Sequence, residues 1–276
     1  MTSRETGLRV TRSVRHSLRM ATIRTLTFNT LFRGQARARL RALGQILERS
    51  AYDVVCLQEV MSPLNLALLR KITESYGHAA HAATFPLVQG GLVTLSRWPI
   101  TDQRFVSFRR NGPARGEWLM RKGALVARVQ IEGRPVTVVN THLSANKTGD
   151  WSRANTYARI EAAELKELAS AVAETGSADP LLVMGDFNVP RDSWLFDEFV
   201  SATGLRDVLA GDSEPTYRPT PEFGDTKAID QVLMRAPAGQ EPAADARLVF
   251  QDAVRLPNGR SAFLSDHYGI AAEISG

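Results

Sequence analysis

The sequence predicts a single α/β domain over residues 21–276. Short apolar runs that alternate in the manner of β-strands recur along the chain, and segments with helical periodicity lie between them. At 276 residues and 43% hydrophobic content, the chain can bury a substantial core. No internal repeat or low-complexity linker interrupts it after residue 20, so one compact domain is the simplest organisation.

Residues 1–20 form a basic tail that we exclude from the fold. The tail carries five arginines and one acid, a net charge of 5 − 1 = +4, whereas the whole chain carries +5. The remainder is therefore nearly neutral, and its charge alone does not indicate a polyanionic partner. The tail is Arg-rich and acid-poor like an organellar targeting peptide, but we expect a disordered extension, and Met20 could be the true start.

The cysteine and hydropathy content indicate a cytoplasmic protein. Cys56, in the apolar run DVVCLQE, is the one cysteine, so a disulfide within the chain is excluded and a reducing compartment is favoured. Its strand-like neighbours predict a core residue rather than a nucleophile. The tail lacks the apolar region of a secretory signal, and no run is long enough to span a bilayer.

The first half of the domain predicts strand–helix pairs followed by a group of strands. Ser62-Pro63 is a helix start, and Gly133 marks a hairpin between two strands. In chain order, the expected elements are strand 22–29, helix 33–49, strand 52–59, helix 64–72 and strands 90–97, 122–131 and 135–143. We expect the arginines of helix 33–49 to form ordinary helix surface.

The second half predicts a long helix and further strands. In the helix, Ile160 and Leu165 belong to an apolar stripe, whereas Glu161 and Glu164 are expected to be solvated. The expected elements are helix 151–173, strand 181–188, helix 194–200 and strands 229–235, 246–254 and 265–274. Residues 236–244, rich in Ala, Pro and Gly, are expected to form a loop.

Polar residues stand where the apolar strands end. Each has an ordinary interpretation alone, as a cap, a turn residue or a satisfied buried histidine, but together they form a coherent chemical set. Ligands of α/β proteins gather at such strand ends, where rigid strands hold side chains in place. The set is Asn29, Glu59, His142, Asp186, Asn188, Asp230, Asp266 and His267.

This set suits hydrolysis of a phosphate ester. Carboxylate and amide oxygens without thiolates favour Mg²⁺ or Mn²⁺, which Glu59 could hold with help from Asn29 and Asp266. His267, paired with Asp230, could act as general base or as electrostatic partner of the phosphate.

The remaining members of the set fit the same reaction. His142 and Asn188 can donate hydrogen bonds to phosphoryl oxygens as charge develops. Asp186 could orient or deprotonate water, so we treat Asp186 and His267 as a coupled unit.

The ordered set of motifs resembles the endonuclease/exonuclease/phosphatase superfamily. The matching pieces are TFN, LQE, GGLVTLSRWPI, KGALVARV, VNTHL, GDFN, IDQVL and SDHYG, which span residues 22–270. The resemblance implies a four-layer α/β/β/α sandwich of two packed mixed sheets with the active site at one end. It implies Asn29, Glu59 and Asp266 at the metal. It also implies phosphate or water contacts for His142, Asp186 and Asn188, and an Asp230 that orients His267.

The substrate class is less constrained by these motifs. Residues 88–145 resemble the neutral and bacterial sphingomyelinases, which implies a phospholipid substrate; the alternative is a Mg-dependent nuclease acting on DNA or RNA. A non-catalytic binding module is a more remote alternative, since such a protein usually loses a metal or histidine position and none is lost here.

Two segments bear on contact with a membrane. The bacterial sphingomyelinases carry an aromatic hairpin between the counterparts of Asp230 and His267, where this chain offers only Phe250 and Phe263. Residues 105–122 instead interleave aromatic and basic side chains, which suits an anionic lipid surface, a nucleic-acid backbone or a solvated hairpin. The basic tail could make similar peripheral contacts.

Overall fold

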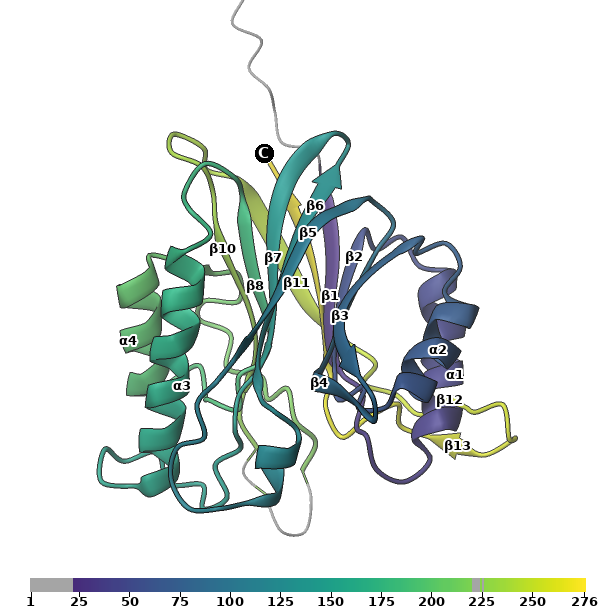
Figure 1. Cartoon of the computed structure of the whole chain (residues 1–276), viewed down its shortest axis with the longest axis horizontal. Helices are drawn as coiled ribbons and strands as arrows, with labels where there is room; N and C mark the ends of the chain where they lie inside the picture. The colour runs from purple at the N-terminus through teal and green to yellow at the C-terminus, as the bar shows by residue number, and fades with distance from the viewer. Residues whose placement is uncertain (1–21, 220–223, 225) are drawn as a thin grey trace, which may run out of the picture.

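Two six-stranded sheets pack face to face between two pairs of helices, an α/β/β/α arrangement that confirms the predicted fold class (Figure 1). This computed structural model describes residues 22–219, 224 and 226–276; the expected tail lies outside them and stays a prediction. The helices are α1 (Ala36–Glu48), α2 (Pro63–Ile72), α3 (Thr156–Ala173) and α4 (Trp194–Thr203), with a 3₁₀ turn at Gly116–Leu119. No helix in the described part of the chain is long and apolar enough to cross a bilayer.

The first sheet has the order β11-β14-β1-β2-β4-β3, and the second has the order β5-β6-β7-β8-β10-β9. The first contains β1 (Ile23–Asn29), β2 (Val54–Gln58), β3 (His78–Thr84), β4 (Leu87–Ser96), β11 (Ala243–Val249) and β14 (Gly269–Ser275). The second contains β5 (Ile100–Ser107), β6 (Gly123–Ile131), β7 (Arg134–His142), β8 (Leu181–Asp186), β9 (Arg206–Asp207) and β10 (Asp230–Arg235). A small hairpin, β12 (Val254–Arg255) and β13 (Ser261–Ala262), precedes β14.

One parallel pair in each sheet brings strand ends together. β1 pairs with β2 and β7 pairs with β8 in parallel, whereas the other pairings within the two sheets are antiparallel. Parallel neighbours finish at the same edge of a sheet, so Asn29, Gln58, His142 and Asp186 end four strands at one end of the molecule.

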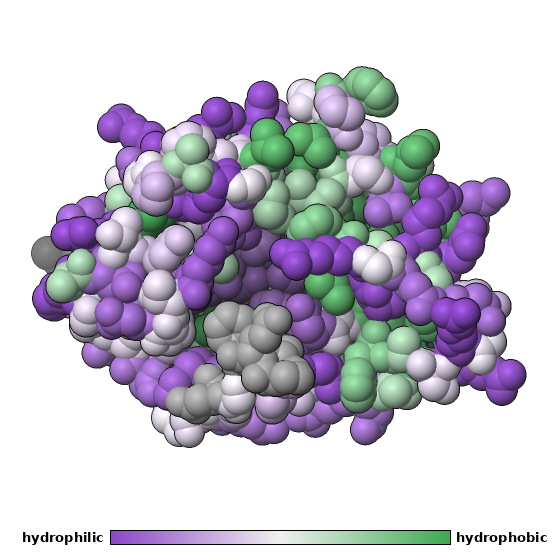
Figure 2. All heavy atoms as spheres, turned by 90° about the horizontal axis from the view of Figure 1, so that it is seen from below, coloured by the Kyte–Doolittle hydropathy of each residue, from purple (hydrophilic) through white to green (hydrophobic). Residues whose placement is uncertain are grey.

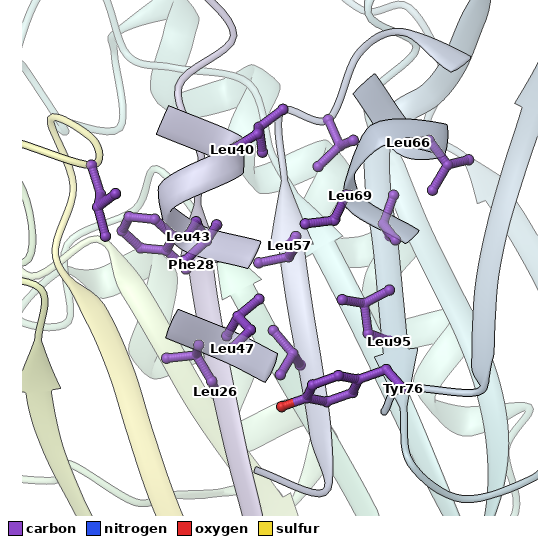
Figure 3. Packing of buried hydrophobic residues seen from close by; sticks show 14 of the residues in the cluster. Leu26, Phe28, Leu40, Leu43, Leu47, Leu57, Leu66, Leu69, Tyr76 and Leu95 are labelled. Carbon is purple, nitrogen blue, oxygen red and sulfur yellow. The ribbon is translucent and has the colours of Figure 1, made fainter. Parts of the chain in front are cut away.

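Leucines of α1 and α2 form the core on the outer face of the first sheet. Leu40, Leu43 and Leu47 lie above Leu26 and Phe28 of β1 (Figure 3). Burying a side chain of this size stabilises the fold by about 1.5–3 kcal/mol. A second cluster joins α3 and α4 to the other sheet.

The space between the sheets is filled by a third cluster. It includes Val54 and Cys56 from the first sheet and Val138 and Met184 from the second. Burial raises the pKa of the Cys56 thiol to about 12, which confirms the prediction of an unreactive core cysteine.

A polar bridge links the sheets beneath the strand ends. Gln58 Nε2 donates to Asn140 Oδ1 at 2.8 Å, and Asn140 Nδ2 donates at 3.1 Å to the carbonyls of Leu57 and Val93. Both side chains are fully buried, so their hydrogen bonds fix one sheet against the other.

Some sequence expectations were wrong. β3 and β5 were not predicted, and the helix expected over 151–173 begins only at Thr156, where Asn155 caps it. Glu161 and Glu164 are buried rather than solvated, because residues 108–122 and 144–146 cover that face of α3. Arg39 is also buried, not ordinary surface: its guanidinium donates at 2.6 Å to the carbonyls of Leu31 and Arg33.

Candidate active site

The predicted site residues converge at one end of the two sheets. Asn29, His142 and Asp186 end their strands, and Glu59 follows β2 directly. Asp230 begins β10 opposite Asp186, and Asp266 and His267 precede β14, whose first residues pair with the end of β1. Asn188 follows β8 by two residues.

The Asp186 carboxylate stands at the centre of the site. Its Oδ2 accepts a hydrogen bond of 2.9 Å from Asn29 Nδ2, and it lies 3.2 Å from His142 Nε2 and 3.8 Å from His267 Nε2. Burial alone would raise the pKa of Asp186, but the nearby His267, His142 and Lys122 hold it well below its usual range. Asp186 is therefore ionised at neutral pH.

His267 is held by a buried aspartate. Its Nδ1 lies 2.9 Å from Asp230 Oδ2, which also accepts a hydrogen bond of 2.6 Å from Thr216 Oγ1. Burial alone would lower the pKa of His267, but Asp230 and Asp186 raise it to about 10. Burial and the charge of Asp186 raise the pKa of Asp230. The proton between these groups therefore resides on the imidazole, and its Nε2–H faces Asp186.

The Nε2 atom of His142 contacts a buried lysine as well as Asp186. Lys122 Nζ is in close contact with His142 Nε2, and Lys122 begins the run that becomes β6. Burial lowers the pKa of Lys122, against the opposing charges of Asp186, Glu117, Glu59 and Glu164. Histidine and lysine nitrogens thus gather around the ionised Asp186, and nitrogen donors of this kind suit the oxygens of a phosphate.

Asn188 is placed by a turn rather than by strand alternation. β8 ends at Asp186, and Asn188 adopts a left-handed conformation with φ of 52°. Its backbone N–H donates to Asp186 Oδ1 at 2.9 Å, and its Nδ2 donates to the Leu143 carbonyl at 2.9 Å. Gly185 permits the close approach of β7, since a Cβ there would lie 2.0 Å from the carbonyl oxygen of Thr141.

Asn29 and Glu59 both accept hydrogen bonds from the turn that follows β1. Asn29 Oδ1 accepts from the N–H of Leu31 at 3.0 Å, and Glu59 Oε2 accepts from the N–H of Phe32 at 2.8 Å. Gly91 packs against Glu59, where a Cβ would lie 2.9 Å from the Glu59 Cα. Burial lowers the pKa of Arg39, against the opposing charges of Asp266 and Glu59, so both carboxylates lie near this guanidinium.

The oxygen atoms of Asn29, Glu59 and Asp266 are suitable ligands for a hard divalent cation. Asn29, Glu59 and Asp266 offer only amide and carboxylate oxygens, which Mg²⁺ prefers. A second group, Asp186, Asp230 and His267, brings ligand atoms within 4.8 Å of one another. There the Asp230–His267 hydrogen bond occupies Asp230 Oδ2 and His267 Nδ1, whereas Asp230 Oδ1 has no hydrogen-bond partner among the described residues. Asn29, Glu59 and Asp266 remain the predicted ligands.

Sequence reasoning missed three residues that shape the site. Lys122 was assigned to a surface segment, although it is buried and directly precedes β6, whose first five residues are apolar. Thr216 orients Asp230, and Arg39 lies close to Glu59 and Asp266. Thr216 and Arg39 carry no local signal, because their contacts come from segments distant in the sequence.

This combination of fold and site defines a phosphoric ester hydrolase: two packed sheets that gather carboxylates, amides, histidines and a lysine at one end. The endonuclease/exonuclease/phosphatase family matches residues 26–267, and the chain belongs to that family.

Several curated relatives that the chain resembles are named as sphingomyelinases or sphingomyelin phosphodiesterases, and one, from Schizosaccharomyces pombe, is named an inositol phosphosphingolipids phospholipase C (29% identical over 60% of this chain and 40% of its own length). A putative neutral sphingomyelinase of Drosophila melanogaster is 29% identical over 86% of this chain and 56% of its own length. The human sphingomyelin phosphodiesterase 2 is 26% identical over 86% of this chain and 59% of its own length. The chain thus spans a little over half the length of the Drosophila and human relatives.

Solved structures share the fold. The beta toxin of Staphylococcus aureus, in a structure with bound magnesium ions, aligns with a TM-score of 0.76 at 17% identity over 91% of this chain and 99% of its own. A truncated TDP2 from Caenorhabditis elegans aligns with a TM-score of 0.71 at 18% identity over 92% of this chain and 98% of its own. Because differently named proteins share this fold, with TM-scores of 0.76 and 0.71, the fold does not select the substrate.

Proposed function

We propose that this protein is a divalent-metal-dependent phosphodiesterase that acts on a sphingomyelin-like phospholipid. The observation that carries the lipid preference is the position of its exposed apolar side chains. Among the described residues, the large exposed hydrophobics are Phe32 (39% exposed), Leu64 (70%), Phe85 (96%), Leu119 (73%) and Phe263 (47%). We call these five residues the apolar rim.

Four of the five residues of the apolar rim lie within five positions of a site residue in the sequence. Phe32 and Leu64 follow Asn29 and Glu59 closely in the sequence. Phe85 is at the turn of the β3–β4 hairpin, whose β4 begins at the site end of β2.

The other two residues of the rim also lie close to site residues in the sequence. Leu119 precedes Lys122, and Phe263 precedes Asp266. Seen from this end, apolar patches border a polar recess (Figure 2). Soluble proteins seldom expose several large apolar groups around one opening, and such an arrangement suits an interface that meets lipid.

Basic residues accompany the rim. Arg109, Arg110 and Arg121 lie on the segment that carries Leu119 and are exposed. Apolar side chains mixed with arginines suit peripheral contact with an anionic membrane surface through residues 105–122. Phe250, by contrast, packs against Phe28 with ring centroids 5.0 Å apart and does not contribute.

In the proposed reaction, a bound Mg²⁺ supplies charge neutralisation at the phosphate and activation of water. Asn29, Glu59 and Asp266 would hold it. Lys122, His142 and Asn188 bind the phosphoryl oxygens, and their donors match the charge that develops in the transition state. Asp186 and His267 act as a coupled unit that positions the attacking water, with Asp230 and Thr216 fixing the imidazole. The single core thiol, Cys56, supports our proposal that the protein works in the cytoplasm.

The test is a substrate comparison. Purified protein with Mg²⁺ is incubated with sphingomyelin vesicles, plasmid DNA and single-stranded RNA, and the release of phosphocholine or of cut strands is measured. We expect the wild type to release phosphocholine and His267→Ala to release none. The matched control His78→Ala, at the end of β3 that lies away from the site, should keep this activity. Cleavage of DNA or RNA without lipid hydrolysis would establish the nuclease alternative, and absence of all three activities would favour a binding module.

A further inference from the structure

A hollow of about 250 Å³ opens beside Lys122, on the side of the site nearest α3. Five of its lining residues are cations: Arg109, Arg110, Arg115, Arg121 and Lys122. Two carboxylates, Glu117 and Glu164, also line it. The formal balance of the lining is therefore 5 − 2 = +3, which attracts an anion.

Arg115 is the cation that these carboxylates neutralise. Its side chain is 6% exposed and lies 3.1 Å from Glu117 and 3.8 Å from Glu164, and it donates a hydrogen bond of 2.8 Å to Ser144. Arg115 therefore fixes the segment to α3 and has little capacity left for a ligand.

The three exposed arginines of the lining differ from Arg115 in their hydrogen bonds and ion pairs. Arg109, Arg110 and Arg121 are exposed, and within the described part of the chain their guanidinium groups make no hydrogen bond or ion pair. Three exposed guanidinium groups that line one hollow add positive potential there, which favours a bound anion. Their planar donors match the oxygens of a phosphate or carboxylate.

A buried donor in the same lining also lacks a partner. The indole Nε1 of Trp118 is inaccessible to solvent and has no acceptor among the described residues. Leaving a buried N–H unsatisfied is costly, and a small rotation of the indole toward an acceptor oxygen in the hollow would satisfy it.

One side chain connects the hollow to the candidate active site. Lys122 lines the hollow and also contacts His142 at the centre of the site. We propose that the hollow binds a second anionic group, a phosphate or a carboxylate, carried by the same substrate as the scissile phosphate. This inference rests on the proposed function and deepens it: the enzyme prefers a headgroup with an added negative charge over the cationic choline headgroup. The small volume fits one such group rather than a nucleic-acid strand.

The first test measures binding without turnover. Titration calorimetry in EDTA compares inorganic phosphate with pyrophosphate, which places two anionic groups side by side. We expect pyrophosphate to bind about tenfold more tightly or better, and the double variant Arg110→Gln/Arg121→Gln to lose that advantage. The control Arg41→Gln, an exposed arginine on α1 at the other sheet, should retain it. Equal affinity for the two ions, or an unchanged double variant, would overturn the proposal.

The second test uses vesicles that contain either sphingomyelin or ceramide phosphoethanolamine carrying an N-succinyl carboxylate. We expect higher kcat/KM for the succinylated lipid, with the preference lost in the double variant and kept in Arg41→Gln. A preference for choline would overturn the inference. If neither lipid is cleaved, the proposed function fails, and the pyrophosphate titration still decides whether the hollow binds a second anion. Tighter binding of an oligonucleotide than of pyrophosphate, lost in the double variant, would assign the hollow to nucleic acid and overturn the proposal.

Discussion

The side-chain amide of Asn29 donates a 2.9 Å hydrogen bond to the Asp186 carboxylate and so joins the two sheets at the site. Asn29 ends β1 of the first sheet, and Asp186 ends β8 of the second. Both are at most 2% exposed, so the interaction is shielded from water. The orientation of the central carboxylate therefore depends on how the two sheets pack.

Replacing Asn29 with Ala is expected to lower both activity and stability. The change leaves the buried Asp186 without one donor, which costs about 1–3 kcal/mol in the free energy of unfolding. It also misorients the central carboxylate, so kcat/KM should fall by about 100-fold or more. Urea denaturation and initial rates on one preparation measure both. Unchanged activity would contradict the role of this hydrogen bond.

Asp230→Asn is expected to impair catalysis without unfolding the protein. The amide cannot hold His267 in the same protonation state, and a loss of kcat of about 100- to 10,000-fold is expected. Because Asp230 acts through His267, the pH profile of kcat should also shift. Thr216→Val, which removes the hydrogen bond to Asp230, should give a smaller loss in the same direction. A pH profile identical to that of the wild type would refute the positioning role.

The apolar rim predicts separable effects on lipid binding and chemistry. Phe85→Ser and Leu119→Ser each remove a side chain that would enter a bilayer, worth about 1.5–3 kcal/mol when fully buried. Each should weaken binding to sphingomyelin vesicles about tenfold, measured by co-sedimentation. Hydrolysis of a soluble phosphodiester should be unchanged. Wild-type vesicle binding by both variants would exclude the rim from membrane contact.

Glu161 predicts an unusual dependence of stability on pH. Burial, with the neighbouring charge of Glu164, raises the pKa of Glu161 from its ordinary value of 4.5 to about 9. The folded protein therefore keeps a proton on Glu161 that the unfolded chain releases above pH 4.5. The stabilisation is complete at acidic pH and is lost as pH rises toward 9, by at most about 1.4 kcal/mol per pH unit.

Glu161→Gln should remove this slope and increase stability at pH 8. The measurement is urea denaturation from pH 5 to 8 on the wild type and the variant, with Glu167→Gln as the control on the same helix. Parallel curves for the wild type and Glu161→Gln would show that Glu161 is ionised in the folded protein.

The fold and the site differed in how well the sequence could predict them. Strand runs such as 122–131 and 181–186 are apolar enough to identify their own elements, and polar residues at their ends marked the site. β3, HAAHAAT, has too few large apolar residues to be recognised, since its position is set by pairing with β4.

Side chains whose environment is made by distant segments could not be predicted. Helical periodicity assigned Glu161 and Glu164 to the solvated face of α3, but the segment that carries Arg115 and Lys122 covers that face. The same segment hides Lys122 against His142. Local patterns report which face of a helix is polar, and tertiary packing decides whether that face meets water.

The most direct test of the central claim is the metal dependence of phosphodiester hydrolysis. Hydrolysis of bis(p-nitrophenyl) phosphate is followed after EDTA treatment and again after Mg²⁺ is restored, for the wild type, Glu59→Gln and the control Glu132→Gln in the β6–β7 turn at the opposite end. We predict that EDTA abolishes the wild-type rate and that Mg²⁺ restores it. Glu132→Gln should match the wild type, whereas Glu59→Gln should regain little activity at any Mg²⁺ concentration. Hydrolysis that persists in EDTA, or a Glu59→Gln variant as active as the wild type, would contradict the account.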